Sequence, residues 1–507
     1  MEHFNVARYI PCERRDTILV DVSLSKQLQV GTFEHAVDFL LDHRIDLSIF
    51  DARYKNDHCG RPAWHPRLLL KIILVAYARG LKSSRDMASA CEENIVFMAL
   101  TGCAKPDFTT LAHFVSSMKK EISGIFCEVL LYCSEMDLIG GEMFAVDGHK
   151  ISSNAAKEWS GKHKDLGEKA EKFRAVVADL LTRHRGADGA MSEPEKKRAK
   201  KMERNIEKIE TFLRENKQRI GTSGKEVQSN ITDNESAKMM SSHGAIQGYN
   251  GVAMVDAKSQ IIVHAEAFGS GQEHDLLKQM IDGARKNLIT IGKKNDCMDG
   301  KKLAADSNYY TGENCKLAEE EEIDAYIPDQ KFRQRDPRFA NAKNHLPVKE
   351  RKRKYGEQDF RYEADIDRYI CPAGKELRLE NQAKKMGEYV MRVYSARETD
   401  CAECPHRGNC LHKSDGKQRF LSKVVTKTED ECVRRMREKI DSPEGREIYS
   451  RRMGIIEPVF GNIRASKGMD RLTLRGKIKA TIQWMLFAIV HNIEKISHVN
   501  YMNLESG

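Results

Sequence analysis

Long apolar runs are scarce in this chain of 507 residues. The most apolar stretch, "WMLFAIV" at 484–490, is far shorter than the roughly 20 residues that a membrane-spanning helix needs. The first ten residues, "MEHFNVARYI", also lack the apolar core of a secretory signal. These absences argue against a membrane or secreted protein and predict a soluble, cytoplasmic one.

A Gly-rich phosphate-binding loop is missing as well, so no nucleotide cofactor is expected. Cysteine does not point to a secreted disulfide scaffold either. The thirteen cysteines of a cytosolic chain of this length are expected to stay reduced. Several of them, such as Cys91, Cys127 and Cys133, fall within apolar helical patterns and are expected in the core.

Basic residues are abundant by contrast. Lys and Arg outnumber Asp and Glu by 84 to 75, which gives a net charge of +9 and a pI of about 8.8. Between Lys331 and Lys354, ten basic residues accompany only two acidic ones. The last four positions of that block are all basic: Arg351, Lys352, Arg353 and Lys354. Such a block favours a polyanionic partner, because it can neutralise phosphates without reading bases.

Residues 1–138 are predicted to be helical throughout. Apolar positions recur at helical spacing over 65–81, 83–102 and 106–136. Short helices joined by tight turns are typical of a helix-turn-helix-like module, which could bind DNA. They are equally typical of a plain helical bundle that supports dimerisation, and the sequence leaves both alternatives open.

Residues 139–329 alternate short apolar runs with amphipathic stretches. This pattern predicts a mixed sheet flanked by helices, an α/β fold. Strands are expected at 143–147, 251–256, 261–268, 301–310 and 324–329, and helices at 273–288 and 311–322. Apolar residues spaced four and three apart on both sides of a Gly-rich break predict an antiparallel helical hairpin, inserted at 160–220.

Residues 330–440 form a basic, cysteine-bearing insertion with weak periodicity, and the region 441–507 returns to helices. A C-x-x-C pair and two further thiols can close a tetrahedral zinc site. The ligands would be Cys371, Cys401, Cys404 and Cys410, with His406 and His412 as possible substitutes. The alternative is a set of reduced cysteines without metal. We expect a structural Zn²⁺, because a weakly periodic polar segment needs a cross-link to fold.

Three acidic residues stand out for their surroundings. Asp147 and Asp306 each end a short apolar run, and Glu457 lies in "IIEPVF" on an expected helix. A carboxylate among apolar residues costs free energy unless something pairs with it. Each of the three could also be an ordinary turn or surface residue. If they meet, carboxylates without Cys or His suit Mg²⁺ or Mn²⁺, and such ions promote phosphodiester cleavage.

Taken together, these segments resemble the DDE transposases of bacterial insertion sequences, which have an RNase H-like catalytic core. "FAVDGHKISSNAAK" (144–157) is similar to the segment that carries the family's first Asp, and "LAADSNYYTGENC" (303–315) to the segment of the second. "YSRRMGIIEPVFGNIRASKG" (449–468) is similar to the segment of the Glu. Residues 60–85 resemble the N-terminal helical domain of one branch, and residues 246–263 resemble its strand hairpin.

The resemblance implies roles for individual residues. The catalytic ligands of Mg²⁺ or Mn²⁺ would be Asp147, Asp306 and Glu457. The DNA contacts would come from Tyr449, Arg452, Arg464, its rival Lys467, and the basic run 351–354. One departure from the family pattern affects this set: four residues separate Arg452 from Glu457, where the family has three.

The resemblance also implies an activity. The enzyme would hydrolyse a phosphodiester bond at each end of the element and join the freed 3′-hydroxyl to target DNA. Its partners would be double-stranded DNA, as terminal inverted repeats and as target, and further copies of the chain in a homodimer or larger assembly at the nucleoid. Two rivals remain: an RNase H-like nuclease that cuts without joining, and a DNA-binding relic with a decayed site.

Overall fold

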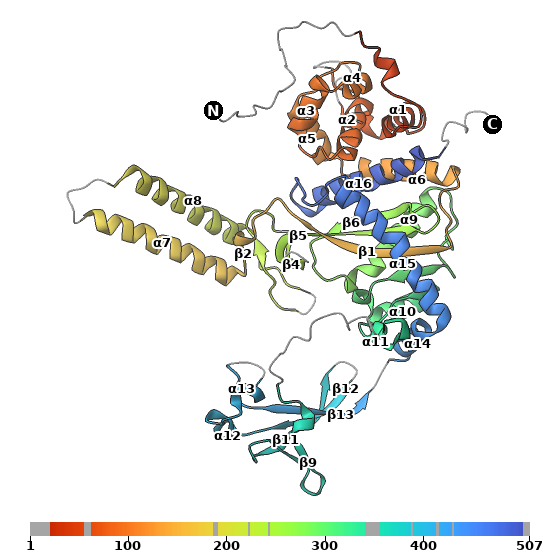
Figure 1. Cartoon of the computed structure of the whole chain (residues 1–507). Helices are drawn as coiled ribbons and strands as arrows, with labels where there is room; N and C mark the ends of the chain where they lie inside the picture. Colours follow the sequence, from red (N-terminus) through yellow and green to blue (C-terminus); the bar gives the residue numbers. More distant parts are fainter. Residues whose placement is uncertain are drawn as a thin grey trace, which may run out of the picture.

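The computed structural model describes residues 21–54, 62–185, 191–221, 224–241, 244–339, 354–386, 389–411, 415–427 and 430–499. A mixed sheet flanked by helices lies at the centre, next to a helical N-terminal region (Figure 1). This arrangement confirms the predicted α/β fold class. A helical hairpin and a small second sheet project from the centre (Figure 1). None of the helices in the described ranges is long and apolar enough to cross a membrane.

The central sheet has six strands. Their order is β4 (Ala237–Ser241), β5 (Gly244–Asp256), β1 (Met143–Ser152), β7 (Lys302–Ala305) and β8 (Asp324–Tyr326), and β6 (Ile262–Phe268) also pairs with β5. Strand β5 runs antiparallel to β1, β4 and β6, whereas β1, β7 and β8 are parallel to one another. The helices packed against these strands are α9 (Leu277–Thr290), α10 (Gly312–Glu320), α14 (Glu431–Asp441), α15 (Pro443–Gly461) and α16 (Lys477–Ser497).

Strand β1 is longer than the sequence indicates. Its first four residues, Met143 to Val146, are buried as expected, but the strand continues through Asp147 to Ser152. The reason is that the two neighbouring strands differ in length. The parallel pairing with β7 stops where Val146 faces Ala305, whereas the antiparallel pairing with β5 reaches Ser152. Asp147 therefore lies just beyond the end of β7 and not at the end of its own strand.

The N-terminal helices are shorter than predicted. They are α1 (Phe33–His43), α2 (Pro66–Ala78), α3 (Ser84–Glu93), α4 (Ile95–Thr101), α5 (Phe108–Ser117) and α6 (Glu121–Glu135), with short 3-10 turns at Leu24–Lys26 and Ser48–Arg53. The helix expected over 83–102 breaks at Asn94, whose Oδ1 accepts the Val96 N–H and so starts α4. The helix expected over 106–136 breaks at Met118, which has a buried side chain and a non-helical ψ of 69°.

Helix α16 connects the N-terminal helices to the sheet. It packs against α1, α2, α5 and α6 as well as against β5 and β6. The fully buried Asn492 bonds β6 twice: its Oδ1 accepts the Ile262 N–H and its Nδ2 donates to the Ile262 carbonyl, both at 2.9 Å. Trp484 Nε1 donates to the Val252 carbonyl at 2.9 Å. One hydrophobic core consequently extends from α1 to the sheet, and the predicted boundary at residue 138 stays a prediction.

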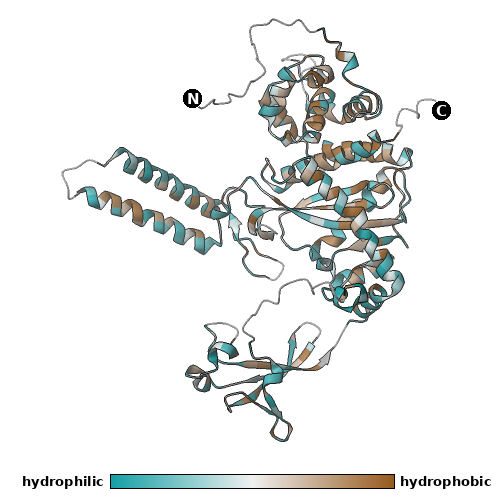
Figure 2. Cartoon of the chain, in the orientation of Figure 1, coloured by the Kyte–Doolittle hydropathy of each residue, from teal (hydrophilic) through white to brown (hydrophobic). Residues whose placement is uncertain are grey.

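The predicted helical hairpin is present. Its helices α7 (His163–Arg185) and α8 (Glu193–Glu215) lie side by side and project away from the sheet (Figure 1). Leu166, Ile209 and Phe212 are buried together near its base. The Glu195 carboxylate accepts the Ser192 N–H at 3.0 Å, and this capping interaction starts α8. Figure 2 shows hydrophobic residues concentrated in the central sheet and α16, whereas the hairpin mixes hydrophobic with hydrophilic residues.

A second sheet, which the apolar pattern does not predict, lies in the cysteine-bearing insertion. Its order is β13 (Phe420–Lys427), β12 (Tyr389–Ser395), β11 (Glu376–Met386), β10 (Arg368–Ile370) and β9 (Arg361–Glu363), each antiparallel to the next. Tyr369 and Tyr394 are buried in it, and Asp367 accepts the hydroxyls of Tyr362 at 2.7 Å and Tyr394 at 2.6 Å. Strands β9 and β10 have only three residues each, and the core of the sheet is built on polar-tipped tyrosine rings, so apolar alternation in the sequence did not reveal the sheet.

Replacing Asn492 with Ala should lower the free energy of unfolding by roughly 2–4 kcal/mol, because the buried N–H and carbonyl of Ile262 would lose their partner. Lys479→Ala, at an exposed position of the same helix, should change it by less than about 0.5 kcal/mol. Urea denaturation measures both. Equal stability of the two variants would show that the Asn492 hydrogen bonds do not hold α16 to β6.

Candidate active site

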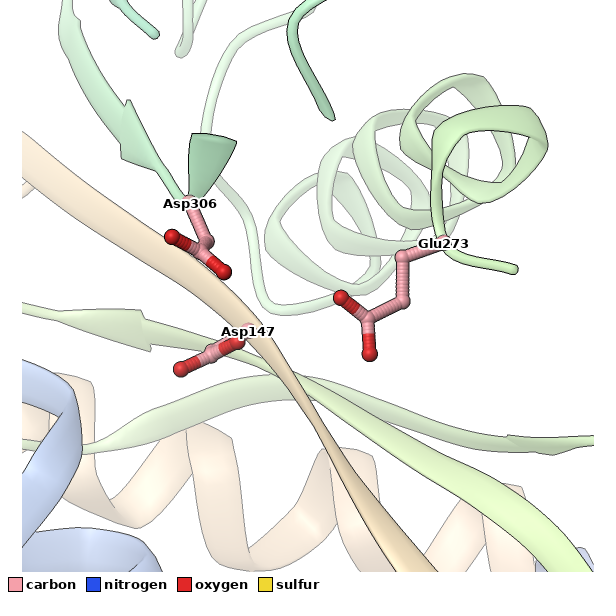
Figure 3. A group of neighbouring side chains, drawn as sticks. All are labelled: Asp147, Glu273 and Asp306. Atoms are coloured by element: carbon pink, nitrogen blue, oxygen red, sulfur yellow. The ribbon is translucent and has the colours of Figure 1, made fainter. Parts of the chain in front are cut away.

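Three carboxylates converge at the edge of the central sheet (Figure 3). Asp147 belongs to β1, Asp306 directly follows β7, and Glu273 lies in the turn ahead of α9. One oxygen of each carboxylate lies within 4.8 Å of the other two. Glu273 is buried, and both aspartates are partly exposed. The expectation that Asp147 and Asp306 lie together agrees with this geometry.

Hydrogen bonds fix the two aspartates. Asp147 Oδ1 accepts a hydrogen bond from the Gly148 N–H at 2.8 Å, and its Oδ2 accepts one from Arg452 Nη2 at 2.6 Å. Asp306 Oδ1 accepts the Ser307 N–H at 2.6 Å, and Oδ2 accepts the side-chain amide of Asn308 at 3.2 Å. Each carboxylate is therefore held by the next backbone N–H and by one side chain, the Arg452 guanidinium at Asp147 and the Asn308 amide at Asp306.

Glu273 was missed by the sequence patterns. It stands in "GSGQEHDLL" (269–277), where an acidic residue ahead of a helix is an ordinary helix-start feature. Its position becomes significant only when β5 pairs with β1, because Asn250 on β5 then donates its Nδ2 to Glu273 Oε1 at 3.1 Å. Asn308 donates to Oε2 at 3.1 Å. No local sequence signal could have found this residue.

Glu457 is placed differently from the aspartates. It is exposed on α15 and lines a cleft together with Asp147, Asp306, Tyr449 and Arg452. In the described ranges, the group of three converging carboxylates does not include it. The structure thus brings the three predicted ligands to one cleft, and the two aspartates among them belong to the converging group.

Arg452 faces the carboxylate of Asp147 and not the solvent. It is 6% exposed, and its guanidinium forms the 2.6 Å ion pair with Asp147. Glu457 follows Arg452 by five positions, one more than in the family pattern. Because an α-helix turns by about 100° per residue, a step of five places the two side chains on different faces of α15, which explains why Arg452 points to Asp147. This position argues against a DNA contact for Arg452. Tyr449, one turn earlier, packs edge-on against Phe332 with ring centroids 5.3 Å apart.

Arg464 and Lys467 differ in exposure. Arg464 is exposed and lines the cleft of the three carboxylates. Lys467 is only 2% exposed, and its Nζ lies 2.7 Å from both Glu494 Oε2 and Asn462 Oδ1. Burial and ion pairing argue against a contact between Lys467 and a DNA backbone, and the predicted contact stays a prediction.

Most of the basic run 351–354 lies outside the described residues, namely Arg351, Lys352 and Arg353. Lys354 is described, and its Nζ donates to the carbonyls of Gly408 at 2.7 Å and Leu411 at 2.8 Å. This charge therefore stabilises the turn after α13 (Arg407–Cys410). The phosphate contact predicted for the run as a whole stays a prediction.

Burial alters the proton affinity of the clustered carboxyls. Burial raises the pKa of Asp147 to about 6; Glu273 and Asp306 add to the rise, and Arg452 and the Gly148 N–H oppose it. Burial also raises the pKa of Glu273. Protons and cations consequently compete for these oxygens in mildly acidic solution.

The four predicted zinc ligands belong to the second sheet's unit. Cys410 is buried there, and Cys371 and Cys401 pack against the same apolar cluster. Burial raises the pKa of the Cys410 thiol, and the nearby thiols of Cys401, Cys371 and Cys404 raise it further. All four are free cysteines. Within the described part of the chain, no three of their sulfurs converge as the three carboxylates do.

Two segments of the chain match known families. Residues 22–117 match the family model described as "Transposase domain (DUF772)", and residues 370–497 match the one described as "Transposase DDE domain". Both matches support an insertion-sequence DDE transposase. No match was found among curated proteins or among solved structures. Glu457 and the four cysteines lie inside the matched segments, whereas Asp147, Glu273 and Asp306 lie outside them.

The contribution of Asp147 to the stability of the folded chain should fall as the pH rises from 4 to 7. Its carboxyl has a pKa of about 6 in the folded chain against an ordinary value of 3.8, so the folded state retains a proton that the unfolded state has lost. This difference corresponds to roughly 3 kcal/mol of lost stability. Chemical denaturation at several pH values, without added metal, measures the loss.

The matched control is Asp147→Asn, which cannot titrate. The stability of this variant should lack the pH dependence that Asp147 contributes. The difference in free energy of unfolding between wild type and variant should therefore change with pH. Parallel pH profiles for the two proteins would show that Asp147 titrates as an ordinary carboxyl.

Proposed function

We propose that this transposase cleaves a phosphodiester bond at each end of an insertion sequence and transfers the freed 3′ end to target DNA. The DDE-domain match suggests a DNA-cleaving enzyme, and the two chemical steps are our proposal. The observation that supports them is the cleft in which β1, the end of β7 and α15 present Asp147, Asp306 and Glu457.

Mg²⁺ or Mn²⁺ fits the donors at this site. The donor atoms are carboxylate oxygens, which hard divalent cations prefer, and no Cys or His is among the three converging residues. In our proposal Asp147, Asp306 and Glu457 hold the cation. When bound, it would supply Lewis acidity to the scissile phosphate and lower the pKa of an attacking water.

Side chains around the carboxylates would position the DNA. Arg464 and Lys150 line the cleft, and they would bind phosphates next to the scissile bond. Arg452 would act as a positioning residue, because its ion pair orients the Asp147 carboxylate and favours its charged form. Tyr449 would form part of the wall that limits how closely the DNA backbone approaches.

The outer parts of the chain would recognise and hold the element ends. We assign end recognition to the N-terminal helices within residues 22–117, because short helices joined by turns can place one helix in a major groove. The net charge of +9 and the run 351–354 would bind phosphates, so that affinity falls as salt rises. Two element ends require two catalytic centres, so we propose a homodimer or a larger assembly.

Replacing any catalytic carboxylate by its amide should abolish cleavage while DNA binding persists. Asp147→Asn, Asp306→Asn and Glu457→Gln should each lower the cleavage rate in Mg²⁺ by a factor on the order of 10³ or more, because an amide cannot replace an anionic ligand. The assay is cleavage and joining of a plasmid that carries the cognate ends, with gel shifts as the measure of binding.

Glu447→Gln is the matched control, since Glu447 is an exposed residue of the same helix that pairs only with its neighbour Arg451 among the described residues. It should cleave like the wild type. Normal cleavage by Glu457→Gln would remove Glu457 from the site. Cleaved ends that are never joined would favour the nuclease over the transposase.

We also propose a structural Zn²⁺ beside the second sheet. The support is the packing of Cys371 and Cys401 against the cluster that buries Cys410, with Cys404 on the adjoining turn. Protein purified without chelators should contain about one Zn²⁺ per chain, as metal analysis would show. Finding no zinc would contradict the proposal.

Cys404→Ser should make residues 370–411 sensitive to protease, because the site would lose one of its four ligands. Cys103→Ser changes an exposed cysteine in the N-terminal helical region and should leave the proteolytic pattern unchanged. Limited proteolysis followed by mass spectrometry compares the two variants.

A further inference from the structure

Glu273 is one of the three converging carboxylates. It lies outside every segment of the sequence that resembles a transposase. It is 6% exposed, and Figure 3 shows it opposite Asp147 and Asp306, approaching from the turn before α9. Its two oxygens accept amide N–H groups from Asn250 and Asn308, both at 3.1 Å. Because Asn308 also donates to Asp306, one amide connects the two carboxylates.

Ion pairs neutralise only one carboxylate of this group. Among the described residues, no lysine or arginine forms an ion pair with Glu273 or Asp306, and Arg452 pairs with Asp147 alone. Lys150 lines the same cleft without such an ion pair, so two of the three carboxylates lack a directly paired cation among the described residues. Buried carboxylates remain charged when they are paired or bind a metal ion, so this arrangement favours a cation.

Two buried polar atoms next to the carboxylates have no hydrogen-bond partner among the described residues. One is the hydroxyl of Tyr309, a residue with 0% exposure. Tyr309 lies in the short turn that Asp306 begins, and its backbone N–H donates to the Asp306 carbonyl at 2.9 Å. The other is Oδ1 of Asn250, which also has 0% exposure. A hydrated cation carries water molecules that can satisfy both atoms.

The backbone leaves room at this point. A Cβ on Gly148 would lie 2.6 Å from Asn250 Oδ1 and 2.9 Å from Glu273 Oε1, closer than such atoms can approach. Any other residue after Asp147 would therefore push Asn250 and Glu273 out of position. The glycine permits the close approach of three chain segments that the carboxylate group requires.

We propose that Glu273 is a further ligand of the divalent cation that Asp147 and Asp306 hold. Together with Glu457, the site then has four carboxylates. The proposal rests on the proposed function and adds a ligand to the same site. An alternative role for Glu273 is purely structural: it would then hold its turn against β5 through Asn250 and have no effect on cation binding.

Measuring the affinity for Mn²⁺ by electron paramagnetic resonance, in the absence of DNA, distinguishes a ligand role of Glu273 from a purely structural one. Glu273→Gln should weaken Mn²⁺ binding at least tenfold, as loss of a ligand requires, and Asp147→Asn should weaken it as well. Glu320→Gln, at an exposed position on α10, should bind like the wild type. Binding by Glu273→Gln within twofold of the wild type, with Asp147→Asn weakened, would overturn the proposal and leave the proposed function intact.

If Asp147→Asn also binds Mn²⁺ like the wild type, the proposed cation site itself is contradicted, and so is the role of Glu273 as one of its ligands. A second measurement needs no variant, in case Glu273→Gln does not fold. Fe²⁺ bound to the wild-type protein, with ascorbate and peroxide, should cut the backbone near residues 147, 273 and 306. Cuts near 147 and 306 without one at 272–274 would overturn the proposal.

Discussion

The geometry of this site depends on the point at which the pairing between β1 and β7 ends. Val146 faces Ala305, and the next residue in each strand is an aspartate, Asp147 in one and Asp306 in the other. Neighbouring strands lie about 4.8 Å apart, so the two carboxylates must come close together wherever this register is kept. Their mutual repulsion is offset at Asp147 by Arg452, which reaches the strand end from α15.

The register itself is protected by the core. Apolar residues before Asp147 are fully buried between the sheet and its helices, and α16 fixes β6 through Asn492. Both large insertions enter at loops, the helical hairpin between β1 and β4 and the second sheet between β8 and α14. Neither interrupts the pairing of β1 with β7. The chain can therefore carry additional units while the positions of its carboxylates stay unchanged.

Charge connects the stability of the site to its proposed chemistry. Gathering Asp147, Asp306 and Glu273 at one partly buried site, where Arg452 pairs with Asp147, raises the pKa of two of them and costs folding free energy. Proteins commonly accept such local costs where they bind ligands, because the ligand then relieves them. Arg452 is better understood as part of this charge balance than as a DNA contact, since it is buried against Asp147.

The sequence by itself determined the parts of this protein that depend on near neighbours in the chain. Apolar runs indicated β1, β7 and the β5–β6 hairpin, and apolar spacing indicated the paired helices α7 and α8. The same runs directed attention to Asp147 and Asp306, which the structure brings together. These features are local, because burial of a strand or the start of a helix is encoded within a few residues.

The tertiary structure alone decided the rest. Glu273 joins the site through pairing between distant strands, Arg452 turns toward Asp147 because of its rotation around α15, and Lys467 is buried by contact with α16. The second sheet has a tyrosine core that leaves no apolar alternation. Strand register, helix rotation and the depth of burial are set by residues far apart in the chain, so no local pattern could contain them.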